Sequence, residues 1–131
     1  MTPTPDSIIT HPSPYSVPET LDRLEVILRA KNITIFARID HSGEAEKIGL
    51  HMPSTQLLIF GNPKGGTPVM LAAPLSAIDL PLKALAWQDT EGKVWLSYND
   101  AAYLKDRYSI DDHLLGPISA ASALIEQAVA S

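Results

Sequence analysis

A glycine-rich segment, residues 60–68, has the residue types and spacing of an anion-binding loop. It reads Phe-Gly-Asn-Pro-Lys-Gly-Gly-Thr-Pro and follows an almost wholly apolar run, residues 55–60, that is typical of a central strand. Glycines would let backbone N–H groups converge, Thr67 would cap a helix starting at Pro68, and the positive end of that helix would favour a carboxylate or phosphate. Gly61, Asn62, Gly66 and Thr67 are therefore candidate ligand-binding residues.

The same segment does not match a nucleotide-binding P-loop. Its pattern is G-x-x-x-x-G-T, and the Lys that precedes the Thr in a P-loop is missing. Lys64 could supply a positive charge from inside the loop instead. The alternative is that Gly61, Asn62, Gly65 and Gly66 only form a tight corner between a strand and a helix.

A second candidate is the pair Asp40-His41 at the end of another predicted strand. A His beside a carboxylate is the smallest unit of acid–base or metal chemistry, although Asp40 could equally be a turn or capping residue. The four histidines, at positions 11, 41, 51 and 113, show no spacing that places two ligands on one helix face. We therefore predict no metal site, and the sequence indicates no cofactor.

Asp79 and Lys83 are the last polar candidates. They lie four residues apart in an extended segment, where they could face a cleft beside the glycine loop or simply be solvated charges at the entry to a strand. The two tryptophans, Trp87 and Trp95, fall in strands that we expect to pair, so their rings could stack across the sheet.

The composition limits which partners the chain can have. It has 131 residues, no Cys, 15 acidic against 10 basic residues and a formal charge of −5. Disulfides and thiolate chemistry are excluded, and the acidic balance argues against nucleic acid, whose binding needs a surplus of Lys and Arg. The longest apolar stretches are far shorter than the roughly 20 residues of a membrane-spanning helix. We expect one cytoplasmic domain, residues 1–131, with a flexible tail at 1–6.

Hydrophobic periodicity and turn residues predict an α+β order in one sheet with helices on one face. The first helix has the capping box Ser16-x-x-Glu19, and a turn at 89–92 joins the last two strands. The predicted strands are 7–10, 33–40, 55–60, 80–87 and 93–98, and the later helices are 42–49 capped by Ser42, one starting at Pro68, 101–108 and 117–130.

An ordered series of motifs resembles the bacterial and archaeal domain of unknown function 302 family. The motifs are Phe-Ala-Arg-Ile-Asp-His at 36–41, Gly-Leu-His-Met-Pro at 49–53, Leu-Ile-Phe-Gly-Asn-Pro at 58–63, Gly-Thr-Pro-Val-Met at 66–70, Ile-Asp-Leu-Pro-Leu-Lys at 78–83, and the Trp87, Trp95 and Tyr98-Asn99 region. The resemblance implies a TATA-box-binding-protein-like fold, β-α-β-β-β-β-α, with a curved antiparallel sheet backed by helices. It implies no reaction. One departure is Tyr108, which stands where the family often has His.

These observations favour a small-ligand-binding or scaffolding domain, with an anion or metabolite as ligand and a homodimer as its assembly. The alternatives are a small enzyme that uses Asp40 and His41 as an acid–base pair, and a purely structural or protein-interaction module. The enzyme hypothesis requires His41 and Thr67 to open on one pocket, and it fails if these side chains lie more than about 10 Å apart.

Overall fold

The computed structural model describes residues 6–131, so all of the predicted tail except Asp6 lies outside the described residues. The chain forms a five-stranded antiparallel sheet in the order β1-β5-β4-β3-β2. The strands are β1 (Ile8–Ser13), β2 (Thr34–Asp40), β3 (Thr55–Gly61), β4 (Leu82–Gln88) and β5 (Val94–Asn99). The predicted α+β class and the curved antiparallel sheet are confirmed.

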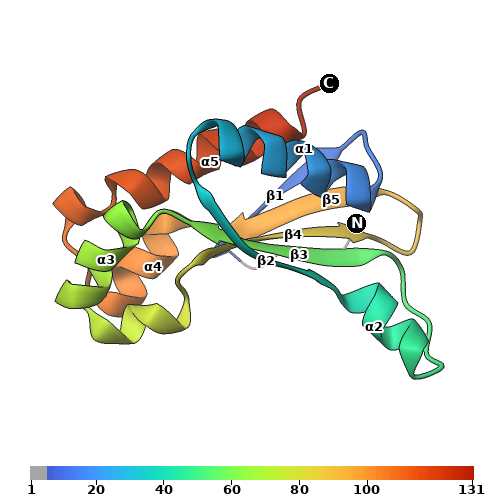
Figure 1. Ribbon diagram of the computed structural model, residues 1–131, viewed down its shortest axis with the longest axis horizontal. Coiled ribbons are helices and arrows are strands. Elements are labelled where there is room, and N and C mark those ends of the chain that lie inside the picture. Colours follow the sequence, from blue (N-terminus) through green and yellow to red (C-terminus); the bar gives the residue numbers. More distant parts are fainter. Residues whose placement is uncertain (1–5) are drawn as a thin grey trace.

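The strands alternate with helices of very different lengths. The α-helices are α1 (Val17–Ala30), α2 (His41–Lys47), α3 (Pro63–Ala72), α4 (Ala101–Tyr108) and α5 (Gly116–Ala128), and the 3-10 helices are η1 (Pro74–Ile78) and η2 (Asp112–Leu114). In Figure 1 the long helices α1 and α5 lie on one side of the sheet, while α2 lies at one end of it and α3 and α4 at the other.

The core fills the space between the sheet and the two long helices. Strand residues alternate between the two faces, so every second side chain of β3, β4 and β5 points at the helices. The fully buried members of this face are Leu58, Phe60, Ala84, Ala86 and Leu96, and they pack against Leu21, Leu24, Leu28 and Ile125 of α1 and α5. The apolar stripe predicted from the spacing of the leucines is therefore the buried face of α1.

The opposite face of the sheet, which we call the open face, carries the other half of each strand. Its members are the register partners of one another, and most of them are intermediate in exposure, whereas Ser97 is buried and Pro12, Thr34 and Asn99 are exposed. Its apolar residues are Ile8, Pro12, Ala37, Ile39, Leu57, Ile59, Gly61, Leu85, Trp87 and Trp95, and its polar residues are Thr10, Thr34, Thr55, Lys83, Ser97 and Asn99. No helix of residues 6–131 lies against the middle of this face in Figure 1.

Several element boundaries differ from those predicted, each for a local reason. β1 continues through Pro12, which an edge strand tolerates because its unpaired side needs no N–H. The short helix α2 begins one residue earlier than predicted and is capped by Asp40 instead of Ser42. The helix expected to start at Pro68 begins at Pro63 and is capped by Asn62, so the glycine segment is its first two turns. Ser16 caps α1 as predicted.

Gly65 lets α3 pack closely against the start of α5. A Cβ atom built on Gly65 would lie 2.5 Å from the Cβ of Pro117, far inside the contact distance of two carbon atoms. Because the proline ring is rigid, it cannot turn aside as a long side chain would. The two helices therefore touch at a point where only a glycine fits.

We expect Gly65→Ala to lower the free energy of unfolding by about 1 to 2 kcal/mol, because overpacking against Pro117 outweighs the gain in helix propensity. Gly116→Ala is the matched control, since a Cβ there meets nothing within 4 Å. It should leave the stability unchanged or raise it slightly. Urea unfolding of both variants measures the difference, and equal stability of the two would contradict the close contact.

Candidate functional site

A cavity of about 160 Å³, which we call the α3 pocket, lies where the end of β3 meets the first turns of α3. The segment from Leu80 to Leu82 and the start of α5 complete its walls. Apolar side chains dominate its lining, and these are Ile33, Phe36, Phe60, Pro63, Met70, Leu80, Pro81, Leu82, Pro117, Ile118 and Ala121. Gly61, Asn62, Gly66 and Thr67, all predicted from the sequence, also line it.

A β-bulge in β2 supplies the aromatic side of this pocket. The register of β2 against β3 shifts between Ile35 and Ala37, which leaves Phe36 as the extra residue. Phe36 is 52% exposed although it is a large aromatic residue. Its ring comes close to Gly61, where a built Cβ would lie 3.7 Å from it. The bulge thus places a half-exposed ring at the rim of the α3 pocket.

The first turn of α3 does not form the predicted anion cradle, because its N–H groups are already bonded. Asn62 Oδ1 accepts the N–H of Lys64 at 3.0 Å, and the carbonyl of Asn62 accepts those of Gly65 and Gly66 at 2.9 Å. Pro63 has no N–H to offer. Lys64 is exposed and is not among the residues that line the α3 pocket. Thr67 lies in the second turn of α3 and caps nothing.

Asp79 and Lys83 line a second cavity, also about 160 Å³, between the end of β5, α4 and α5. This cavity is more polar, with Asn99, Asp100, Ser119 and Ser122 in its walls. It shares Phe60, Leu82, Ile118 and Ala121 with the α3 pocket, so these side chains separate the two spaces. The Nζ of Lys83 donates to the carbonyl of Pro81 at 3.0 Å.

Asp79 is held by α4, a contact that the sequence analysis did not find. Arg107 donates to Asp79 Oδ2 at 3.0 Å, and the hydroxyl of Tyr108 donates to the same oxygen at 2.5 Å. Arg107 also donates to the hydroxyl of Tyr103 at 2.7 Å. The one feature of the sequence that points to this contact is the spacing of Tyr103 and Arg107, which places both residues on one face of a predicted helix. The carboxylate of Asp79 therefore anchors the segment before β4 to α4.

Asp40 and His41 lie far from the α3 pocket. Asp40 pairs with Gln56 at the start of β3, and Asn62 lies six residues further on, which corresponds to about 20 Å along a strand. Figure 1 shows α2 and α3 at opposite ends of the molecule. The structure thus does not bring His41 and Thr67 to one pocket, and the geometry required for an enzyme that joins the Asp-His pair to the glycine segment is absent from residues 6–131.

Asp40 instead has a local structural role. Its Oδ1 accepts the hydroxyl of Ser42 at 2.7 Å and the N–H of Gly43 at 3.0 Å. The hydrogen bond from Ser42, followed by that from Gly43, holds the pKa of the Asp40 carboxyl below its usual range. A Cβ on Gly43 would lie 2.6 Å from the other carboxylate oxygen, so a larger residue there would make the Asp40 side chain shift. The capping role that the sequence left open for Asp40 is confirmed.

Within residues 6–131, no three His, Asp or Glu side chains gather as they would around a metal ion. None of the helices in that range has both the length and the apolar character needed to cross a bilayer.

A family model described as "Domain of unknown function DUF302" matches residues 9–131. The chain belongs to the DUF302 family. The crystal structure of an uncharacterized conserved DUF302 protein from Bacillus stearothermophilus superposes with a TM-score of 0.78 and covers 95% of this chain and 97% of that one. Its sequence identity is 17%, so the likeness concerns the fold alone. The family resemblance predicted from the motifs is confirmed.

Curated relatives are considerably longer than the segment they share with this DUF302 chain. "Fluoride-specific ion channel FluC 1" of Brucella suis biovar 1 (strain 1330) is 43% identical over 103 residues, which are 79% of this chain and 41% of that protein. "Fluoride-specific ion channel FluC 2" of Brucella melitensis biotype 1 (strain ATCC 23456 / CCUG 17765 / NCTC 10094 / 16M) is also 43% identical over 103 residues, 79% of this chain and 38% of its own length. The chain spans about two fifths of these relatives.

We expect the cap of α2 to weaken in acid. A carboxyl whose pKa is lowered by folding contributes its full stability above the ordinary carboxyl pKa of about 4 and loses it as the pH falls through the folded value. Asp40→Asn keeps an acceptor for Gly43 but removes the titration. The variant should lose less stability than the wild type between neutral and acidic pH in urea unfolding, with Glu46→Gln as a control for one charge on α2. Parallel profiles for the wild type and Asp40→Asn would contradict the cap.

We expect Asp79→Asn to lower the pKa of the Tyr108 phenol. The hydrogen bond to Asp79 raises that pKa because the carboxylate binds the neutral phenol and repels the phenolate. With Asn in place of Asp, the nearby Arg107 would favour the phenolate. Ultraviolet titration follows phenol ionisation directly, and Tyr108→Phe identifies which transition belongs to Tyr108. An unchanged titration in Asp79→Asn would show that the contact does not form in solution.

Proposed function

We propose that the chain is a small-ligand-binding domain whose site is the α3 pocket and whose ligand is mainly apolar. The observation that carries the proposal is the lining of that pocket, where eleven apolar side chains surround the space and the half-exposed ring of Phe36 stands at its rim. A large aromatic side chain that stays half exposed beside an apolar hollow is a feature of binding sites.

The size of the α3 pocket limits the ligand to a small group. Apolar cavities of about 150 Å³ hold a molecule of the size of benzene. The α3 pocket, at about 160 Å³, therefore suits one ring or one short branched chain. Asn62 uses its Oδ1 to cap α3, which leaves its amide nitrogen as a donor at the rim. A ligand with an apolar body and one acceptor group matches this arrangement.

This proposal narrows the set of candidate residues. Gly61, Asn62, Gly66 and Thr67 stay in it, because they line the α3 pocket. Asp79 and Lys83 lie at the adjoining cavity, and Asp40, His41 and Lys64 lie at neither. An anion is a poor ligand here, since the N–H groups of the first turn are bonded to Asn62.

The proposal also includes the homodimer and the cytoplasmic location that we expect from the sequence. It includes a bacterial source as well, which the family resemblance suggests. The name of the Brucella relatives refers to proteins more than twice as long as the segment that matches this chain. The geometry of this chain supports ligand binding in the α3 pocket. It gives no support to a proposal of fluoride conduction.

We expect a leucine at position 66 to fill the α3 pocket. Gly66 lies on α3, and the nearest atom to a Cβ built there is the terminal methyl of Met70 at 3.9 Å, so a side chain enters open space. A fragment screen by NMR on the wild type should give small aromatic or branched ligands that shift the signals of Phe36 and Met70. Gly66→Leu should weaken their binding by about tenfold or more.

Ala72→Leu is the matched control, because Ala72 is exposed on the same helix and does not line the α3 pocket. It should bind the same fragments as the wild type. Binding that survives in Gly66→Leu, or fragments whose shifts map elsewhere, would contradict the site.

A further inference from the structure

The open face is an apolar surface that the described part of the chain leaves uncovered. α1 and α5 pack on the other face of the sheet, as Figure 1 shows. Leu57 and Leu85 are register partners at the centre of the open face, on the two middle strands. Trp87 and Trp95 are also partners, and their rings stack with centroids 6.4 Å apart. The stacking predicted for the tryptophans is confirmed, and it makes one broad aromatic surface.

Most of the polar groups of the open face are already bonded inside the chain. The indole N–H of Trp87 donates to Ser97 Oγ at 2.9 Å, and that of Trp95 donates to Asp89 Oδ2 at 2.9 Å. Thr10 and Ser97 bond each other at 2.8 Å, and Thr55 donates to the carbonyl of Pro53. Lys83 is an exception, because its Nζ makes one hydrogen bond, to the carbonyl of Pro81, and keeps further donors free. For the bonded groups, a partner that covers this face leaves no buried donor unbonded, and a polar ligand would find few groups to bind.

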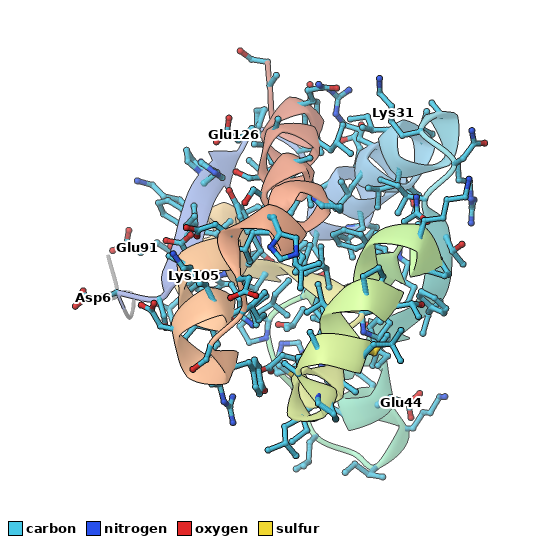
Figure 2. The ribbon with its side chains drawn as sticks, turned by 90° about the vertical axis from the view of Figure 1, so that its left-hand side faces the viewer. Asp6, Lys31, Glu44, Glu91, Lys105 and Glu126 are labelled. Carbon is cyan, nitrogen blue, oxygen red and sulfur yellow. The ribbon has the colours of Figure 1, made fainter. Side chains whose placement is uncertain are left out.

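Charge also favours a second copy of the chain on this surface. The chain has a net charge of −5, yet among the paired strand residues of the open face there is no Asp or Glu and the only basic residue is Lys83. One carboxylate, that of Asp89, lies at the edge of this face, where it accepts the indole N–H of Trp95. Figure 2 shows the labelled acidic side chains Glu44, Glu91 and Glu126 pointing outward at the rim of the molecule. Two identical acidic proteins repel each other over most of their surfaces, but not where open face meets open face.

The paired strands of the open face supply about half of the area that a standard interface needs, and exposed apolar residues beside them add to it. Five strands about 4.8 Å apart and six residues of about 3.3 Å make a face of roughly 20 by 20 Å, about half of the 800 Å² that each partner of a standard interface covers. Exposed apolar residues extend it at both ends, Ile48 and Leu50 after α2 and Leu75 and Ile78 in η1. In Figure 1 both ends lie on the same side of the sheet as the open face.

We propose that two copies of the chain pair through their open faces and form a two-fold symmetric sandwich of two sheets. Packed sheets lie about 10 Å apart, and the inner side chains of each fill the gap. In such a pair the same surface meets itself, which a mainly apolar face with few charges allows. Trp87 and Trp95 lie at this interface, where large aromatic side chains contribute most of the binding energy.

Sedimentation of the wild type should therefore give twice the 14.2 kDa of one chain. Leu57→Lys places a charge at the centre of the open face and should give a monomer whose circular dichroism matches the wild type. Val26→Lys is the control, because Val26 is 69% exposed on α1, on the other side of the sheet, and it should stay dimeric. A wild type that sediments as one chain, or a Leu57→Lys variant that is folded and dimeric, overturns the proposal.

Tryptophan fluorescence tests the same interface without any substitution, so an unfolded Leu57→Lys variant does not leave the question open. The chain has two tryptophans, and both lie on the open face. On dilution, their emission should shift to longer wavelength over the same concentration range in which the dimer dissociates. Dissociation with unchanged emission means that the copies pair elsewhere and overturns the proposal.

Discussion

The contact between Gly65 and Pro117 is the constraint on which one end of the molecule depends, the end formed by α3 and the start of α5. It brings α3 within touching distance of the start of α5, closer than any side chain at position 65 allows. That approach fixes the direction of α3, and with it the walls of the α3 pocket, which include residues of both helices. On the other side of the same end, Arg107 and Tyr108 hold Asp79 and so fix the segment that leads into Leu80 and Pro81. The pocket is bounded by two segments, each held by its own contact.

In the described part of the chain, helices cover one face of the sheet and leave the other uncovered (Figure 1). Each strand contributes to both faces, because successive side chains point to opposite sides. Leu58 and Phe60 are buried under the helices, whereas their neighbours Leu57 and Ile59 point to the open face. A strand that is apolar on both faces is expected when both faces are covered. β3 has this pattern, yet among residues 6–131 helices cover one face. The near-continuous apolar run of β3 therefore already contained the signal for a second covering layer.

Much of the fold could be predicted from the sequence, since it rests on local patterns. The cap at Ser16 and the turn before β5 involve residues close together in the chain, and each is present. The bulge in β2 breaks the simple alternation of that strand, so that Ile35 and Ala37 lie on opposite faces. The start of α3 could not be found in this way. Two glycines cost a helix about 1 kcal/mol each relative to alanine, so propensity argues for a loop. The packing of Gly65 on Pro117, far away in sequence, outweighs that penalty.

The candidate site was harder to predict, because the polar residues that could do chemistry already have structural partners. Asp40 caps α2, Asn62 caps α3 and Asp79 binds Arg107 and Tyr108, so each carboxylate or amide oxygen has a structural partner. Spacing in the sequence shows which residues could meet a ligand, but not which ones the fold has already occupied. The two surfaces on which we base our proposals, the α3 pocket and the open face, are mainly apolar. Recognition at either one would therefore depend on shape and apolar contact, with charge acting mainly to keep other surfaces apart.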